Sequence, residues 1–418
     1  MALAGAGSLA AAPGGSPRLA FSGSDNLAPT PDLAPTPDLA PASDLAPASD
    51  LAPARTPAPA RTPAPRFEPA PAAAQSATLT LPRPTEAQAL AALAAHIDAL
   101  AAADRFSGIV LVARHGRALF EKTAGLADRD AKTPVTRETR FRIGSMNKMF
   151  TAIATLQLVE AGRLSLDDRV GTHLTDYPNR KIASTVTIRH LLTHTGGTGD
   201  IFGGAFERNR ATLREHADYV TLYGARDVTH EPGTKHRYSN YGFVLLGAII
   251  ERVTGRTYYD AVRTSVFERA GMADTDSLPE RETVPHRSTG YVRRGDQWVS
   301  NAAWLPWRGT AAGGGYSTAH DLLRFAQALE KGTLVSKTLL AQATRPQREN
   351  YGYGFRVRGT GAGRSYGHGG GAPGMNGELR VYPALGFIVI ALANLDPPAA
   401  SQVVEFLTQR IPEMRSSP

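Results

Sequence analysis

The sequence predicts an α/β (α+β) domain in which helices flank an antiparallel sheet and form a helical subdomain, preceded by a disordered Pro/Ala-rich arm. Three observations lead to this prediction. Strand-like segments occur near both ends of the chain beyond residue 85, helical patterns fill the region between them, and 15 of the 30 prolines lie in the first 80 residues. Strands from both ends that pair around a helical middle form one mixed domain, not a doubly wound parallel sheet.

The arm divides into two segments. Residues 1–25 form a low-complexity leader whose apolar start is similar to a signal segment but has no Lys or Arg ahead of it. We expect either a degenerate or truncated signal segment, with the true start upstream, or a leader that carries no targeting signal. Residues 26–84 repeat a six-residue Ala-Pro pattern, and its prolines deny both helix and ladder hydrogen bonds. They are predicted to be a disordered linker, and residues 85–418 the folded domain.

Composition excludes several classes of protein. The absence of cysteine excludes thiol nucleophiles and cysteine-ligated metal sites. The net charge of +8 does not predict a nucleic-acid-binding protein, because no run of five or more Lys or Arg occurs. No stretch of 18 consecutive apolar residues predicts a transmembrane helix.

The expected elements follow the chain in order. Residues 85–103 predict a helix, because Thr85 can cap its N-terminus and leucines recur at helical spacing. Residues 106–116 and 117–128 predict an antiparallel hairpin rich in β-branched residues. Four more strands are expected in 351–359, 365–370, 377–383 and 386–395, with helices between in 145–160, 188–193, 240–252, 258–270 and 319–329.

Ser145 and Lys148 open the helix that carries the predicted chemistry. The helix is apolar nearly all round, which indicates burial, yet Lys148 lies in its first turn on the same face as Ser145. Burial disfavours the charged form of lysine and lowers its pKa towards the range in which it accepts protons. The S-x-x-K pattern therefore predicts a serine nucleophile with a lysine base, although about one such pattern occurs by chance in a chain this long.

Tyr238 and Asn240 form a second motif, at the start of another apolar helix. They offer a phenolic proton carrier and an amide that can fix Lys148 or a substrate carbonyl.

The segment His368-Gly369-Gly370-Gly371 is a third motif, at the end of a strand-like stretch. Its glycines would let a substrate lie against the strand edge, and the N–H of Gly371 could join that of Ser145 in an oxyanion hole.

The ordered set S-x-x-K, Y-x-N and H-x-G resembles the serine β-lactamase and penicillin-binding-protein superfamily, in particular the branch of class C β-lactamases, DD-carboxypeptidases, D-amino-acid peptidases and related esterases. The resemblance covers roughly residues 90–408, with supporting stretches at 189–197, 232–255 and 311–325. It implies a β-lactamase/transpeptidase-like fold and a serine hydrolase that cleaves an ester, amide or D-peptide bond through an acyl-enzyme.

The resemblance also implies a role for each motif residue. Carried onto this sequence, the roles are nucleophile for Ser145, proton acceptor for Lys148, second proton carrier for Tyr238, orienter of lysine and substrate for Asn240, third-motif polar and substrate-binding positions for His368, Gly369 and Gly370, and oxyanion donors for the N–H groups of Ser145 and Gly371.

One departure from the family pattern bears on the substrate. The third motif is H-G-G here, whereas the β-lactamases of this family normally have K-T-G, whose lysine helps hold the carboxylate of the drug. Histidine is only partly charged at neutral pH, so an esterase or D-peptidase is favoured over a β-lactamase proper. The alternative from another class is a non-catalytic cell-wall binding or sensor module, against which the retained Ser145, Lys148 and Tyr238 argue.

Other patterns in the sequence compete with these three motifs. Residues 363–367 fit the G-x-S-x-G elbow and 368–371 a lipase oxyanion loop, but no histidine follows His368, and the order of elements is wrong for both. His190 and His194 have the i, i+4 spacing of zinc ligands, but without a third ligand a structural role is favoured. Residues 196–204 are glycine-dense and fit either a mobile gate or an ordinary loop.

We expect no cofactor, no metal and no nucleic-acid partner. The expected partner is a small-molecule or peptide substrate, with peptidoglycan-derived peptides as one candidate class. The family suggests an exported protein of the periplasm or cell envelope, an expectation that the leader itself does not support.

Overall fold

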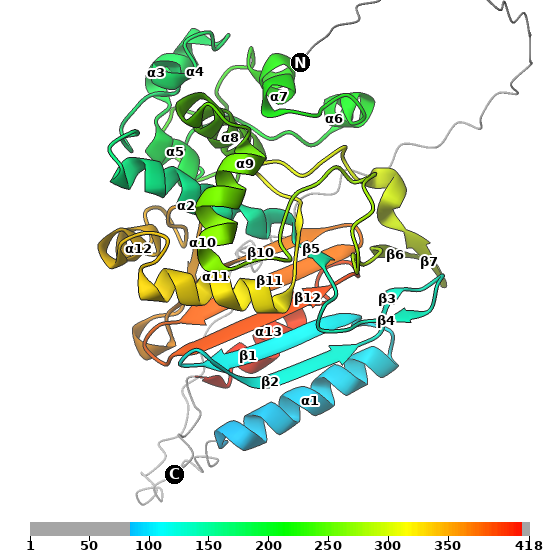
Figure 1. Cartoon of the computed structure of the whole chain (residues 1–418). Coiled ribbons are helices and arrows are strands. Elements are labelled where there is room, and N and C mark those ends of the chain that lie inside the picture. The colour runs from blue at the N-terminus through cyan, green and yellow to red at the C-terminus, as the bar shows by residue number, and fades with distance from the viewer. Residues whose placement is uncertain (1–83, 412–418) are drawn as a thin grey trace, which may run out of the picture. The chain divides into compact units, whose positions relative to one another are not determined.

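A computed structural model describes residues 84–411 of the chain (Figure 1). The predicted leader and, apart from Pro84, the predicted linker lie outside the described residues, so both stay predictions. Within the described part, the centre is a six-stranded antiparallel sheet with the order β2-β1-β12-β11-β10-β9. Its strands are β1 Gly108–Arg114, β2 Arg117–Ala124, β9 Arg356–Arg358, β10 Ser365–Ala372, β11 Met375–Tyr382 and β12 Phe387–Ala393. The predicted mixed α/β fold is confirmed.

Both faces of this sheet are buried, which explains the near-continuous apolar runs in its central strands. In β1, Ile109 and Leu111 belong to the core under the helical layer, whereas Val110 and Val112 belong to the core on the opposite face. Successive side chains of a strand point to opposite faces, so two cores require apolar residues at every position. The sheet is therefore the middle of three layers.

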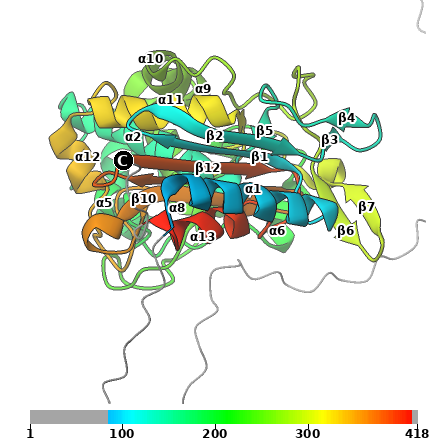
Figure 2. The ribbon, with the colours of Figure 1, turned by 90° about the horizontal axis from the view of Figure 1, so that it is seen from below.

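Two helices from opposite ends of the described chain cover one face of the sheet. They are α1 Glu86–Ala102 and α13 Ser401–Thr408, which lie side by side in Figure 2. Thr85 caps α1 as predicted, in a capping box with Gln88 that contributes about 1 kcal/mol. The rings of His96 on α1 and Phe406 on α13 stack with centroids 4.1 Å apart, so the two helices pack directly against each other.

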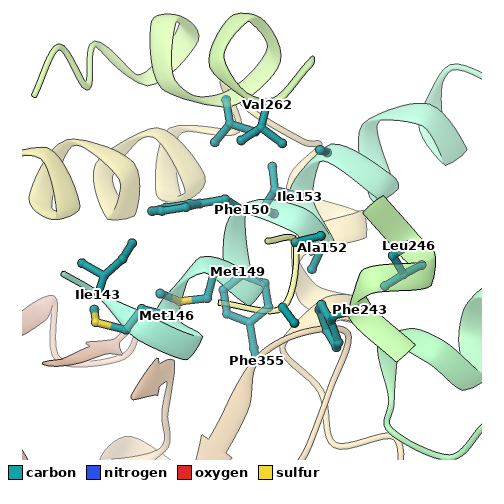
Figure 3. Close-up of a cluster of buried hydrophobic side chains, with 14 of the residues drawn as sticks. Ile143, Met146, Met149, Phe150, Ala152, Ile153, Phe243, Leu246, Val262 and Phe355 are labelled. Carbon is teal, nitrogen blue, oxygen red and sulfur yellow. The ribbon is translucent and has the colours of Figure 1, made fainter. Parts of the chain in front are cut away.

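The helical layer covers the other face, and its centre is α2 Asn147–Glu160. Figure 3 shows the apolar side chains around α2, among them Phe150 of α2 itself, Phe243 of α8 and Phe355, which directly precedes β9. The other helices of the domain are α3 Val170–His173, α4 Arg180–Thr185, α5 Ile188–Leu192, α6 Gly204–Asn209, α7 His216–Tyr223, α8 Asn240–Thr254, α9 Tyr258–Val262, α10 Glu268–Ala270, α11 Ala319–Lys331 and α12 Lys337–Ala343.

Three short pairs of strands complete the fold. They are β3 Leu126–Asp128 with β4 Thr133–Pro134, β5 Phe141–Arg142 with β8 Tyr316–Ser317, and β6 Tyr291–Arg294 with β7 Gln297–Ser300. The pair β5–β8 matters for the site, because it holds the segment before Ser145 against the segment after Gly315.

The sequence patterns located the main elements but not the short ones. All six strands of the central sheet and the helices α1, α2, α5, α8 and α11 occur where they were expected. The helix expected over 258–270 is interrupted by a π-helical turn at Arg263–Phe267, which directs both Val266 and Phe267 into the core. Helices α3, α4, α6, α7, α12 and α13 and strands β4 to β8 were not predicted, because most segments this short carry little periodicity.

Candidate active site

Ser145 lies in a 3-10 turn, Gly144–Met146, that leads directly into α2. Gly144 has φ of +50°, and a Cβ at this position would lie 3.3 Å from the backbone N of Gly371. A glycine is therefore suited both to the turn and to the close approach of strand β10. The Ser145 side chain is partly exposed, whereas Lys148, one turn further on, is fully buried.

Lys148 connects the first two predicted motifs. Its Nζ lies 3.1 Å from Ser145 Oγ and donates a hydrogen bond of 2.7 Å to Asn240 Oδ1. It donates a further hydrogen bond to the main-chain carbonyl of Ala312. The amine is thus held at three points, and the serine hydroxyl is one of them.

The pKa of Lys148 lies well below its ordinary value of 10.5, chiefly because burial removes water from the ammonium. The two charged groups that affect it next act in opposite directions: Asp200 raises the pKa, and Arg356 lowers it. Desolvation prevails over both. The site therefore favours a neutral amine that can accept a proton.

A loop beneath α2 fixes the carbonyl that Lys148 uses. Asn147 donates to the carbonyl of Thr310 over 2.7 Å, and Thr151 donates to that of Ala311, also over 2.7 Å. Both donors lie on the first turns of α2 and are buried. The next carbonyl, that of Ala312, is therefore held by the same helix that carries the lysine.

Tyr238 covers the lysine from the other side. Lys148 Nζ lies 4.6 Å from the centre of the Tyr238 ring. The Ser145 side chain lies close enough to Tyr238 to oppose part of the rise in its pKa. Burial raises the pKa of Tyr238, so the phenol keeps its proton. The ring of His194 packs against Tyr238 with centroids 4.2 Å apart, and its Nδ1 accepts from the Ser239 N–H over 3.1 Å.

Asn240 is oriented by an acid that lies outside the three motifs. Its amide Nδ2 donates to both carboxylate oxygens of Asp200, over 3.0 and 3.1 Å. This contact turns Oδ1 of Asn240 towards Lys148, where it is needed as an acceptor. Asp200 is a single acid in a loop without periodicity, so only knowledge of the loop's position relative to Asn240 could have indicated it.

The third motif contributes its backbone, because the His368 side chain is turned into the protein. His368 is 1% exposed, and its Nε2 and Nδ1 pair with the Tyr351 hydroxyl over 2.9 Å and with the Gly369 carbonyl over 2.6 Å. Burial holds the pKa of His368 well below 6.5, which keeps the ring neutral. A neutral ring with both nitrogens engaged supports the wall of the site from behind. The side chain predicted to be the polar, substrate-binding group of the third motif is thus enclosed, and its substrate-binding role stays a prediction.

The glycines after His368 allow strand β10 to lie against the nucleophile turn. A Cβ at Gly370 would lie 1.9 Å from the carbonyl oxygen of Ile143 and 3.0 Å from Ser145 N. Strand β9 pairs with β10 only as far as Gly367, so the following edge of β10 has no partner strand within residues 84–411. The N–H groups of Ser145 and Gly371 belong to this junction.

Arg356 is a second group that the sequence patterns did not indicate. It lies on β9 opposite Gly367, and its guanidinium carbon is 5.6 Å from the centre of the Tyr238 ring. Among the described residues, no carboxylate forms an ion pair with it. The pairing of β9 with β10 places this cation beside the site, and that pairing cannot be read from Arg356 alone.

The structure also accounts for the competing motifs. Ser365, in the G-x-S-x-G pattern, is a buried first residue of strand β10, with no following helix. His190 lies in the capping box of α5, whereas His194 lies beyond that helix and binds the Ser239 backbone. The glycine-dense loop at 196–204 is held at its start, since the Gly197 carbonyl accepts from Thr229 N over 2.7 Å.

The three-layer fold and the Ser–Lys–Tyr cluster at the start of a buried helix are those of the β-lactamase and penicillin-binding-protein class. Comparison with known proteins agrees: the family described as Beta-lactamase matches residues 93–410. The chain therefore belongs to the β-lactamase family.

Individual relatives have different names. Penicillin-binding protein 4* of Bacillus subtilis is 33% identical over 263 residues, which are 59% of this chain and 57% of that protein. Esterase EstB of Burkholderia gladioli is 32% identical over 300 residues, 63% of this chain and 76% of that protein. The crystal structure of a D-stereospecific amidohydrolase from Streptomyces sp. is 30% identical, with a TM-score of 0.63 over 76% of this chain and 97% of that one.

The match to the Bacillus protein is partial, because the chain spans only a little over half of its length. Among residues 84–411, no helix combines the length and apolar character that crossing a membrane requires.

Proposed function

We propose that the protein is a serine hydrolase that cleaves an ester, amide or D-peptide bond through an acyl-Ser145 intermediate. The observation that carries this proposal is the 3.1 Å contact between Ser145 Oγ and the buried amine of Lys148. A serine hydroxyl is a weak nucleophile until an adjacent base accepts its proton. The low pKa of Lys148 makes it such a base.

The hydrogen bonds of Lys148 favour this direction of proton transfer. A neutral amine has two N–H bonds and one lone pair. The carbonyl oxygens of Asn240 and Ala312 accept the two N–H bonds, so the lone pair is left for the hydroxyl of Ser145. When Ser145 attacks a carbonyl carbon, its proton passes to Lys148 as the new C–O bond forms.

Tyr238 and the backbone complete the acylation step. The phenol is protonated and lies beside Ser145 and Lys148, so it can pass a proton to the departing alcohol or amine and recover one from Lys148. The negative charge on the carbonyl oxygen would be stabilised by the N–H groups of Ser145 and Gly371. A water molecule activated by the same groups then releases the acid and restores Ser145.

Arg356 supports a substrate with a carboxylate on the leaving group, such as a peptide, whereas the third motif lacks the lysine that is typical of the β-lactamases of this family. The third motif has no lysine, and its histidine is neutral and enclosed. Arg356 is then the cation beside Tyr238 that can face a carboxylate on the leaving group. D-peptides of the cell envelope, including those derived from peptidoglycan, are one such class. The names of the relatives, an esterase, an amidohydrolase and a penicillin-binding protein, agree with this range.

Covalent labelling tests the nucleophile. A fluorescent penicillin or phosphonate probe should label the wild-type protein and fail to label Ser145→Ala. Ser365→Ala is the matched control, because Ser365 is the other motif serine and lies buried in β10. Labelling that persists in Ser145→Ala would refute the assignment. Labelling without turnover of any ester, amide or D-Ala-D-Ala peptide would instead support a binding or sensor module.

A further inference from the structure

We propose that Asp200 binds a protonated amino group on the acyl part of the substrate, so that the enzyme prefers amides and esters of amino acids whose α-amino group is free. The inference rests on the proposed function, since it concerns the substrate of the same site. It names the substrate class, which the Ser–Lys–Tyr cluster alone leaves open.

Asp200 lies close to the reacting groups. Its carboxylate accepts from Asn240, whose other amide atom binds Lys148, and Lys148 contacts Ser145. Three hydrogen bonds and one side-chain amide thus separate the acid from the nucleophile, a span of at most roughly 11 Å. The Asp200 side chain is partly exposed, so a ligand can reach it.

This carboxylate has no ion pair within residues 84–411. The nearby cation Arg226 is engaged elsewhere: its Nη1 donates to the main-chain carbonyl of Asp200 over 2.7 Å, and its guanidinium stacks on Tyr223. The partners of the carboxylate are the Asn240 amide and the N–H of Ile201. A half-buried acid without an ion-pair partner, within about 11 Å of the nucleophile, is suited to an ammonium ion.

The charges of the site assign this ammonium to the acyl side. The leaving group takes its proton at Tyr238, and Arg356 lies over the ring of that residue. A cation there would meet a like charge, whereas a carboxylate or a neutral group would not. Asp200 lies on the side of Asn240 and is the anion of the two charged groups, Asp200 and Arg356. A peptide bound with its amino end at Asp200 and its carboxyl end towards Arg356 satisfies both charges.

The position of Asp200 is held by backbone contacts. The carbonyl of the preceding Gly199 accepts from Ser239, and the Tyr223 hydroxyl donates to the carbonyl of Ile201 over 2.7 Å. The acid is therefore presented on a fixed segment, which limits the entropy lost when an ammonium binds. A mobile gate would lack these contacts at Asp200.

Asp200 also orients Asn240, and the experiment must separate this role from binding. The variant Asp200→Asn keeps an oxygen that can accept from Asn240 but removes the negative charge. The substrates are D- and L-alanine p-nitroanilide and p-nitrophenyl ester, each compared with its N-acetyl form. Loss of orientation alone slows both forms by the same factor, whereas loss of the ammonium contact slows the free amine more.

We expect the wild-type protein to prefer the free amine, and the ratio of kcat/KM for free amine over N-acetyl substrate to fall about tenfold or more in Asp200→Asn. Asp296→Asn, an exposed acid in the β6–β7 turn, should leave the ratio as it is. A wild-type preference for the N-acetyl form, or an unchanged ratio in Asp200→Asn, would overturn the inference while Ser145-dependent hydrolysis stands. Absence of any Ser145-dependent labelling or turnover would overturn the proposed function instead.

Discussion

The start of α2 and the edge of β10 each bury a basic side chain, but the two regions use it differently. Lys148 is fully enclosed and contacts the partly exposed Ser145. His368 is equally enclosed but contacts Tyr351 and Gly369. Burial lowers the pKa of both. The comparison indicates that burial alone does not make a basic side chain catalytic. One of its nitrogen positions must also contact a nucleophile that the substrate can reach.

The largest expected effect tests the helix side of this comparison. Lys148→Ala removes the group that would accept the Ser145 proton, and we expect kcat/KM for a p-nitrophenyl ester to fall by about 10²- to 10⁴-fold. Circular dichroism should confirm that the variant folds. The matched control is Lys181→Ala on α4, an exposed lysine paired with Glu231, which should keep wild-type activity. Loss of tenfold or less in Lys148→Ala would show that another base serves Ser145.

The dependence of kcat/KM on pH tests whether Lys148 is a desolvated base. Only neutral Lys148 accepts a proton, so kcat/KM should rise about tenfold per pH unit below its pKa and level off above it. Because the pKa is lowered, the plateau should begin well below pH 10.5. His368 stays neutral over this range and adds no step. An inflection at about pH 10.5, typical of an exposed lysine, would contradict a desolvated base.

The smallest expected effect on activity concerns His368 on strand β10. His368→Leu leaves the buried Tyr351 hydroxyl and Gly369 carbonyl without partners, which should lower the free energy of unfolding by about 1–3 kcal/mol. Denaturant unfolding measures this loss. We expect kcat/KM to fall by no more than about tenfold.

A second variant of His368 distinguishes a structural role of this side chain from direct contact with the substrate. His368→Asn can still donate to the Gly369 carbonyl, so its stability should lie between those of wild type and His368→Leu. A loss of more than about 10³-fold in kcat/KM with an unchanged unfolding free energy would show that the His368 ring meets the substrate after all.

Much of the fold and the first two motifs could be predicted from sequence, because local patterns determine them. Helical spacing places Ser145 and Lys148 on one face whatever surrounds the helix. The apolar character of α2 predicts the burial that lowers the lysine pKa. The central strands were found because a sheet buried on both faces requires apolar residues throughout, as in β1 and β12.

The rest of the site depends on contacts between distant segments. Asp200 gains its place from a loop that meets Asn240, and Arg356 from the pairing of two strands. His368 was assigned to the site by its motif, but the direction of a strand side chain depends on register and neighbours. Nothing in the local sequence around these three residues specifies which groups they meet.

The sheet order has a consequence for how the protein is made. The last strand, β12, lies at the centre of the sheet, where Gly108 of β1 pairs with Ala393 and Asn376 of β11 pairs with the same residue. During synthesis, the hairpin of β1 and β2 must wait for nearly the whole domain before its neighbour emerges. The edge of β1 that pairs with β12 stays without this partner in the meantime, and such long-range closure is slow. That edge of β1 is therefore open to pairing with other chains until β12 has been translated.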